Sequence, residues 1–405
     1  MISMLLFIPF MAKAALVTIP GGHPSYAVMS LFIADPSRAP ARVPASQTAE
    51  RVVSITVPPR RGETIPSLCR RLAIQLDDLS ATPLHVLAFG SCPAGVAVAD
   101  ELRNLLGRVD FPVTWVEGGA CDAGPIAGLQ VHAFTGRVEH VDFDGRFRGS
   151  IFADGGARQC LVGGLGPEDL SASRPGQTVR ALENLQWVLA EAGFGLDDVV
   201  RTWFFLDDIL SWYDEFNRAR TKLYSGVKFR TGSLPASTGI GAKNPAREAL
   251  TLAAWAFRPL CKNSYAEEVA SPLQCPAPAY GSSFSRALEI STNGGRQLFV
   301  SGTASIALEG KSLWTGDVRK QVDLTMEVVE AILRSRGFSL KDLSRATAYF
   351  RRRTDAPVFA EWLAARGLAK LPVVTTECDI CRDDLLFELE GEARCEKTGI
   401  RSIRS

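Results

Sequence analysis

The sequence predicts an α+β protein made of three copies of one unit, each an apolar sheet with helices on one face. Two observations lead to this prediction. A strand that ends in glycine occurs twice, at Arg158–Gly164 and at Arg296–Gly302, and each copy is followed by helix, strand, helix and strand in the same order. One unit alone would leave sheet surface uncovered, so we expect three units to close around a common axis within one chain.

The helix after each glycine-ended strand has an apolar face with helical spacing. In the second unit the residues expected on that face are Val179, Leu182, Leu185, Val188, Leu189 and Ala192, and in the third unit they are Val322, Thr325, Val329, Ile332 and Leu333. Both helices are expected to stop at a glycine, Gly193 or Gly337, because glycine adopts the left-handed cap conformation most easily.

The remaining elements of the two units also correspond. In the second unit we expect a strand at Val199–Leu206, a helix at Trp212–Tyr224, a Leu-Pro strand at Leu234–Thr238 and a closing strand at Ala249–Phe257. In the third unit they are expected at Leu343–Phe350, Val358–Arg366, Leu371–Thr375 and Leu385–Ala393. The same order in both units supports a duplicated fold.

The first unit is a shorter, degenerate copy. It is expected to hold strands at His85–Phe89, Phe111–Thr114 and Ile126–Phe134 and a helix at Gly95–Leu106. The predicted division is a leader without structure at residues 1–50, units at 51–147, 148–260 and 275–395, and a tail at 396–405.

The composition of the chain argues against several classes of function. The 45 basic and 44 acidic residues are balanced, which predicts no nucleic-acid partner. Nine cysteines without a dense pattern favour a reducing cytoplasm, and four histidines without metal-ligand spacing predict no metal. The apolar run Leu5–Met11 precedes Ala12-Lys13-Ala14, which imitates a signal-peptidase site, but no basic residue precedes the run and it is too short to span a bilayer.

Five sequence blocks carry a family resemblance. They are Arg201–Tyr213, Pro235–Gly239, Tyr280–Arg286, Ser301–Ser305 and Cys381–Glu388. Over about residues 148–395 the chain resembles the RidA (YjgF/UK114) fold, which is normally a homotrimer with ligand sites between subunits. It resembles more closely the chorismatases, which carry this fold as tandem units in one chain. The resemblance implies an enzyme without metal or organic cofactor that releases pyruvate from chorismate and works as a monomer.

Glu388 is the candidate general acid and base. Chorismate chemistry needs an acid beside the vinyl ether, and burial gives a carboxyl group the raised pKa that this role requires. Aligning Leu385-Leu386 with Ala249-Leu250 places Leu252 at the position of Glu388, so a carboxylate would replace a core leucine in one copy. On the residues alone a solvent-facing glutamate is the better interpretation. The resemblance implies instead a catalytic glutamate in this closing strand.

Arg220 and Arg286 are the candidate clamps for the two carboxylates of chorismate, because a guanidinium forms a planar fork that fits a carboxylate. Arg286 stands in a weakly charged stretch, and Arg220 is expected to share a helix face with Tyr213. A solvated helix arginine is the alternative for Arg220, and a core tyrosine is the alternative for Tyr280. The resemblance implies that Tyr213, Arg220, Tyr280 and Arg286 contact the substrate.

Cys381 and Ala304 are expected at the ring end of the pocket. Cys378-x-x-Cys381 could also be half a zinc knuckle or a redox pair, but no second pair or histidine is near it in the sequence. The resemblance implies that both positions vary with the product. Cysteine at 381 favours the hydroxybenzoate-forming enzymes, whereas alanine at 304 is less typical of the 3-hydroxybenzoate type.

Three alternatives remain beside the predicted formation of 3-hydroxybenzoate, alone or with 4-hydroxybenzoate. A RidA-type imine deaminase would need an arginine after the Pro-Ala pair, where this chain has Ser237 and Val374. A ligand sensor without activity would have lost the acid, but Glu388 is present. Plain hydrolysis to a dihydroxycyclohexadiene carboxylate is separated from hydroxybenzoate formation only weakly, through Cys381.

Overall fold

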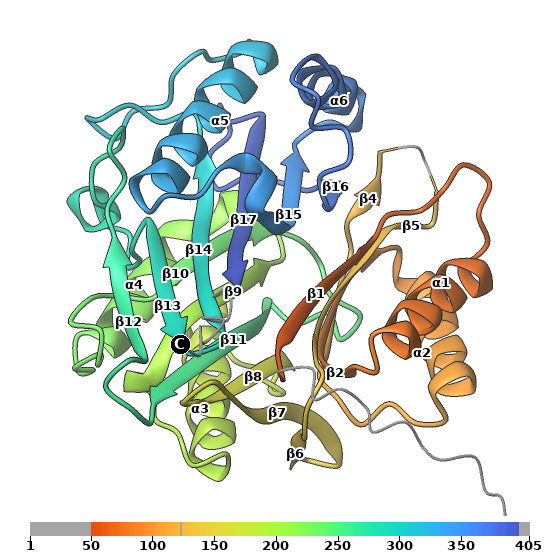
Figure 1. The fold of residues 1–405 in the computed structure, drawn as a ribbon. Coiled ribbons are helices and arrows are strands. Elements are labelled where there is room, and N and C mark those ends of the chain that lie inside the picture. The colour runs from red at the N-terminus through yellow and green to blue at the C-terminus, as the bar shows by residue number, and fades with distance from the viewer. Residues whose placement is uncertain (1–49, 122–123, 397–405) are drawn as a thin grey trace, which may run out of the picture. The chain divides into compact units, whose positions relative to one another are not determined.

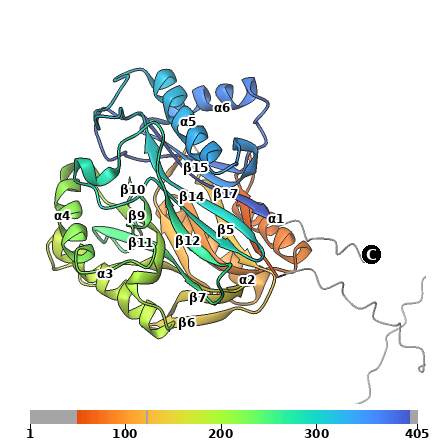
Figure 2. The same cartoon turned by 60° about the vertical axis from the view of Figure 1, so that its left-hand side comes forward.

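Three β-sheets form the core of the computed structural model, which describes residues 50–121 and 124–396 (Figures 1 and 2). The predicted leader and tail lie outside the described residues, apart from Glu50 and Glu396. The first sheet has the order β1 (Val52–Val57), β5 (Ile126–Phe134), β2 (Thr82–Gly90), β3 (Val113–Val116). The second has the order β10 (Ala236–Gly241), β9 (Val199–Leu206), β11 (Leu250–Pro259), β8 (Ala157–Leu165), β7 (Arg146–Asp154), β6 (Glu139–Phe143). The third has the order β12 (Tyr265–Val269), β13 (Ala287–Thr292), β14 (Gly295–Ala304), β17 (Phe387–Glu396), β15 (Leu343–Phe350), β16 (Val373–Glu377), β4 (Gly119–Ala120).

The sheet order confirms the repeated unit. Read from β10 and from β16, the second and third sheets have the same succession of strands, and each begins with a parallel pair, β10–β9 or β16–β15. The first sheet, read from its own parallel pair β3–β2, contains only the first four strands of this succession. It lacks the last two strands, which form a hairpin at the far edge of the other sheets. The first unit is therefore degenerate, as the sequence predicts.

Several strands cross the expected limits of the units. β6 pairs with β7 in the second sheet, although it falls within the predicted first unit. β12 pairs with β13 in the third sheet, although it precedes residue 275. β4 of the first unit pairs with β16 of the third sheet. The sequences of these three short strands do not indicate which strand each one pairs with, because that choice depends on the fold around them.

Each sheet is covered on one face by two helices (Figure 1). The pairs are α1 (Ile65–Asp78) with α2 (Cys92–Leu106), α3 (Arg174–Glu191) with α4 (Tyr213–Tyr224), and α5 (Val318–Ser335) with α6 (Ala356–Ala365). Gly193 and Gly337 follow α3 and α5 with φ of 74° and 75°, as expected for left-handed caps. Val179, expected in the core, is 38% exposed, whereas its neighbour Thr178 is buried. In the described part of the chain, no helix combines the length and apolar character needed to cross a bilayer.

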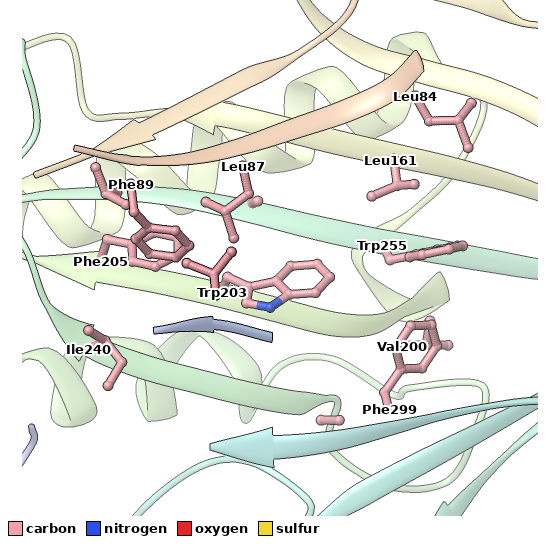
Figure 3. Close-up of a cluster of buried hydrophobic side chains, with 14 of the residues drawn as sticks. Leu84, Leu87, Phe89, Leu161, Val200, Trp203, Phe205, Ile240, Trp255 and Phe299 are labelled. Atoms are coloured by element: carbon pink, nitrogen blue, oxygen red, sulfur yellow. The ribbon is translucent and has the colours of Figure 1, made fainter. Parts of the chain in front are cut away.

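The sheet faces without helices pack against each other. Figure 3 shows Leu87 and Phe89 of β2 beside Trp203 of β9, with Trp255 of β11 and Phe299 of β14 in the same buried cluster. These residues come from all three sheets. Central strands such as β5 and β9 are therefore buried on both faces, one against helices and the other against neighbouring sheets, which explains the long apolar runs in the sequence.

Candidate active site

A cavity of about 600 Å³ lies where the second and third sheets meet. Its wall contains every residue that the sequence analysis singled out for the site: Tyr213, Arg220, Tyr280, Arg286, Ala304, Cys381 and Glu388. These residues are far apart in the chain, and the packing of two units brings them together.

The cavity wall is built on neighbouring strands. β10 contributes Ser237 and Gly239, β14 contributes Gly302 and Ala304, and β17 contributes Glu388. The pairing of β14 with β17 shifts register between Val300 and Thr303, and this irregularity places Ala304 opposite Glu388. Bulges of this kind redirect side chains, and here the shift occurs beside the cavity.

Glu388 is 4% exposed although it lies on the cavity wall. Burial, and next the negative charge of Glu390, raise the pKa of its carboxyl group to about 8, while Arg201 and Arg286 act in the opposite direction. The group is therefore mostly protonated at pH 7. It can donate a proton to a bound molecule and take one back, which a solvent-facing glutamate on this strand could not do.

The strand register corrects the predicted counterpart of Glu388. Arg345 pairs with Glu392, and its counterpart in the second unit, Arg201, pairs with Trp255. Counting four residues back from Glu392 and from Trp255 leads to Glu388 and to Thr251, not to Leu252 as the alignment of leucine pairs predicted. A one-residue error in a strand exchanges the two faces of the sheet. Leu252 instead packs in the core against the helices.

In the other two units, the positions equivalent to Glu388 carry no carboxyl group and pack closely against neighbouring residues. Thr251 donates a hydrogen bond from Oγ1 to the carbonyl of Leu165 at 3.1 Å. In the first unit, His85 occupies the position of Arg345 and pairs with His132. Counting four residues back from His132 leads to Gly128, which is therefore the counterpart of Glu388. A Cβ at Gly128 would lie 2.5 Å from Val374 Cγ2, so no side chain fits there. Of the three equivalent positions, only that of Glu388 carries a carboxyl group.

Arg220 is 1% exposed and reaches the cavity from α4. Its Nη2 donates to Asn217 Oδ1 at 2.7 Å and its Nη1 donates to Ser237 Oγ at 3.4 Å. The guanidinium carbon lies 5.0 Å from the ring centre of Phe216. Its Nε has no hydrogen-bond partner among the described residues. The solvated helix arginine is therefore excluded.

Arg286 is 3% exposed and precedes β13. Its Nε donates to the carbonyl of Cys275 at 2.9 Å, and its Nη2 has no partner within the described residues. The guanidinium lies 5.3 Å from the ring centre of Tyr280. Neither Arg220 nor Arg286 forms an ion pair in the described part of the chain. Two buried cations without anionic partners create a strong site for a carboxylate or another anion.

Both tyrosines of the cavity retain their phenolic protons. Burial raises the pKa of Tyr280 to about 12 and raises the pKa of Tyr213 further above its ordinary value. Each hydroxyl can therefore donate a hydrogen bond to an anionic ligand. The cavity thus offers donors from two guanidinium groups and two phenols, and one protonated carboxyl group.

Cys381 and Ala304 lie on the cavity wall beside this acid. Burial, followed by the charge of Glu388, raises the pKa of the Cys381 thiol to about 12, so the thiol stays neutral and is a poor nucleophile. Cys378 and Cys381 are both free thiols. Across residues 50–121 and 124–396, no group of His, Cys, Asp and Glu side chains is arranged to hold a metal ion.

Sequence reasoning missed the outer cations of the cavity. Arg218 and Lys222 on α4 and Arg382 beside Cys381 also line it. A more open hollow of about 860 Å³ adjoins it and shares Tyr213, Arg218, Cys381 and Arg382. The helical spacing of Asp214, Asn217, Arg218 and Thr221 could have revealed this face of α4, since these residues lie three or four positions apart.

A buried network of charges lies beneath the cavity. Arg201 of β9 and Arg345 of β15 both pair with Glu390 of β17, and Arg345 also donates to Glu392 at 2.8 Å. His132 of the first sheet lies 2.8 Å from Glu392. All three sheets therefore contribute to one network, which the sequence analysis did not predict.

Comparisons with known proteins agree with this architecture. A family model described as endoribonuclease L-PSP matches residues 161–250. A 3-hydroxybenzoate synthase of Streptomyces hygroscopicus is 29% identical over 329 residues, which cover 71% of this chain and 91% of that protein. A chorismatase of the same organism is 27% identical over 48% of this chain and 60% of its own length.

Two further comparisons concern the fold. A RutC family protein of Pyrococcus horikoshii is 30% identical over 103 residues, which are 24% of this chain and 79% of that protein. A crystal structure of a chorismatase, 21% identical, has a TM-score of 0.60 and covers 85% of this chain and 98% of its own. The chain therefore belongs to the RutC family, and as a chain of tandem units it is similar over most of its length to a 3-hydroxybenzoate synthase and to chorismatases.

Proposed function

We propose that this chain converts chorismate into 3-hydroxybenzoate, alone or with 4-hydroxybenzoate, and pyruvate, with Glu388 as general acid and base. One observation carries the proposal: a carboxyl group that is mostly protonated at pH 7 shares a cavity with two buried guanidinium groups that have no anionic partner within residues 50–121 and 124–396. Chorismate has two carboxylates and an acid-sensitive vinyl ether. The similarity to a 3-hydroxybenzoate synthase over 91% of that protein supports the choice of product.

Binding follows from the cations. Arg220 and Arg286 each take one carboxylate, and Tyr213 and Tyr280 donate hydrogen bonds to the same groups. Hydrogen bonds to charged partners contribute about 1.5–3 kcal/mol each. Arg286 and Arg220 have N–H groups for this purpose that are buried and have no partner in the described part of the chain, so the substrate would satisfy these donors.

The chemistry starts with a proton from Glu388. The carboxyl group protonates the terminal methylene carbon of the enolpyruvyl group, and positive charge develops on the ether carbon. The methylene becomes the methyl group of pyruvate. The oxygen of the neighbouring ring hydroxyl group attacks the ring carbon that carries the ether, the bond from this carbon to the ether oxygen breaks, and pyruvate leaves.

The Glu388 carboxylate takes the hydroxyl proton and returns it to the resulting epoxide, which opens at the carbon that first carried the hydroxyl group. Loss of the hydrogen on the carbon that keeps the oxygen, again to Glu388, makes the ring aromatic with the oxygen at the 3-position, whereas opening of the other bond gives the 4-isomer. All atoms of chorismate then appear in the two products, with no net uptake of water.

The ring end of the cavity governs the product. Cys381 and Ala304 present small, neutral surfaces there, and the Cys381 thiol has too high a pKa to act as a nucleophile. Hydrolysis to the dihydroxycyclohexadiene acid differs from hydroxybenzoate formation because it takes up one water molecule and does not make the ring aromatic. Cys381 therefore acts by shaping the pocket around the ring and by limiting access of water.

The test is incubation of the purified protein with chorismate, with the products separated by HPLC against standards. Wild type should give pyruvate and an aromatic acid, and Glu388→Gln should slow the formation of both by about 10²–10⁴-fold, the usual contribution of a general acid. Glu396→Gln is the matched control, because Glu396 lies on the same strand but its side chain is exposed. Pyruvate with the diene acid would overturn the proposed product, and no pyruvate at all would overturn the proposed reaction.

We also propose that the chain acts as a monomer. Every residue of the cavity wall comes from one polypeptide, so a second copy is not needed to complete the site. Specific activity should then be independent of protein concentration, and light scattering should find the mass of one chain. An obligate trimer would contradict this proposal.

A further inference from the structure

Three glutamates alternate along the inner face of β17. Glu388, Glu390 and Glu392 are all buried, and successive members lie roughly 6.6 Å apart along the strand. Only Glu388 reaches the cavity. Three carboxyl groups this close would repel each other if all were ionised, so their surroundings must decide which of them carries the proton.

Two neighbouring arginines stabilise Glu390 in its ionised form. Burial opposes its ionisation, but Arg345, Arg201 and the hydroxyl of Thr238 outweigh burial and hold the pKa of Glu390 below its ordinary value. Arg345 donates to its Oε1 at 3.0 Å, and Tyr349 donates to the same oxygen at 3.2 Å. Glu390 is thus a fixed negative charge directly below the cavity.

We infer that Glu390 and Thr238 are positioning residues for Glu388: Glu390 supplies the fixed anion that keeps the neighbouring carboxyl group protonated, and Thr238 ties this anion to the wall of the cavity. The catalytic consequence rests on the proposed function. The protonation of Glu388 itself does not, and it can be measured without any substrate.

Thr238 forms three hydrogen bonds through one hydroxyl group. It donates to Glu390 Oε2 at 2.6 Å and accepts from Arg201 Nη2 at 2.6 Å and from the backbone N–H of Gly302 at 3.1 Å. One donor and two acceptor positions exhaust a hydroxyl group. Gly302 in turn lies against Glu388, because a Cβ on it would overlap Glu388 Oε1. Thr238 therefore couples the position of the strand beside Glu388 to the network below.

The charges around Glu388 come from several elements. Glu390 on the same strand disfavours its ionisation, whereas Arg201 on β9 and Arg286 before β13 favour it. Tyr213 on α4 and Cys381 also face it, and both are neutral. Glu390 is the one anion in this set, and it also pairs with Arg201. Loss of its charge would remove a repulsion and release a cation, and both effects lower the pKa of Glu388.

The first experiment measures this pKa directly. Infrared absorption of the protonated carboxyl group is followed against pH, as the difference between each protein and the same protein carrying Glu388→Gln. Glu390→Gln should lower the pKa of Glu388 by roughly 1–2 pH units. Glu392→Gln is the matched control, since it removes the same charge from the same strand face at twice the distance, and it should shift the pKa by less than half as much. No shift in Glu390→Gln, or equal shifts in both variants, would overturn the inference.

A second variant guards against failure of Glu390→Gln to fold. Thr238→Val keeps the side-chain shape but removes a hydrogen bond that stabilises the Glu390 anion, so the pKa of Glu388 should fall, in the same direction as in Glu390→Gln but by less. With chorismate, kcat should decrease about tenfold with little change in KM, because Thr238 does not line the cavity. Thr238→Ser should restore both values.

An unchanged Glu388 pKa in folded Thr238→Val would overturn the role of Thr238. If wild type itself does not turn over chorismate, the proposed function fails, but the infrared titration still decides the inference. The two failures are therefore distinguishable.

Discussion

Gly302 offers the sharpest test of how closely Glu388 is positioned. A Cβ at this residue would overlap Glu388 Oε1 and would lie 3.1 Å from Glu388 Cδ and 3.3 Å from Thr238 Cγ2. In Gly302→Ala the carboxyl group must therefore retreat by roughly 1 Å or more to reach van der Waals distance. A displacement of about 1 Å at a reacting group can cost about 10²-fold in rate, so kcat should fall about 100-fold.

The expected loss is specific to this position. Gly239 lies on the adjoining strand wall, and a Cβ there would meet Tyr213 at 3.5 Å, an ordinary contact. Neither glycine has a positive φ, so alanine introduces no backbone strain at either site. Gly239→Ala should therefore reduce kcat much less than Gly302→Ala and act mainly on KM. The assay is steady-state release of pyruvate from chorismate, with circular dichroism to confirm that both variants fold.

A double mutant separates the proposed cause from general damage. If Gly302→Ala acts through Glu388, then adding it to Glu388→Gln should cost almost nothing further, because groups that act as one unit are not additive. Independent, multiplicative losses in the double mutant would refute this reasoning, and so would a Gly302→Ala variant with wild-type kcat.

Three further predictions concern Glu388 and Arg286. In the proposed mechanism the protonated form of Glu388 is the active one, and its pKa is about 8. The value of kcat/KM should therefore be level below pH 8 and fall tenfold per pH unit above it, and a profile still level at pH 10 would contradict the mechanism. The same shift, from 4.5 to about 8, means that the folded protein holds a proton that the unfolded chain releases, so stability falls as pH rises through this window. Glutamine needs no proton to stay neutral, so Glu388→Gln removes this pH-dependent loss of stability. Because pH 7 lies 2.5 units above 4.5 and each unit corresponds to about 1.4 kcal/mol, the free energy of unfolding at pH 7 should rise by about 3 kcal/mol in urea titrations. The gain should vanish toward pH 4.5. Arg286→Lys should raise KM for chorismate at least about tenfold, because lysine cannot present a fork to a carboxylate, and an unchanged KM would remove Arg286 from the binding site.

Much of the fold was predictable because its elements have local causes. β9 and β15 were predicted to the residue from apolar runs, and α3 and α5 end at the expected glycines. α1 was missed, although Leu68, Leu72 and Leu76 are buried at helical spacing and carried the signal. The strands at the unit boundaries were missed for a different reason, since their partners are determined by the packing of whole units.

The candidate site was predictable only in part. The residues alone left Glu388 as an exposed side chain, because a strand with alternating charges normally has one face in water. Here the other sheets cover that face, so Arg201, Arg345 and Glu390 are buried as well. The counterpart of Glu388 was displaced by one residue for a related reason, since two adjacent leucines do not define which of them faces the helices.

The three equivalent positions of the closing strand carry Glu388, Thr251 and Gly128. An assembly of identical subunits could not make this choice, because any residue placed at one interface would appear at all of them. Joining the copies in one polypeptide frees each position to change separately. The destabilising buried acid then occurs once, while a threonine and a glycine close the other two interfaces and hold the scaffold together. Covalent linkage thus lets three similar units carry different residues at equivalent positions, so that one unit holds the buried acid while the other two positions serve packing alone.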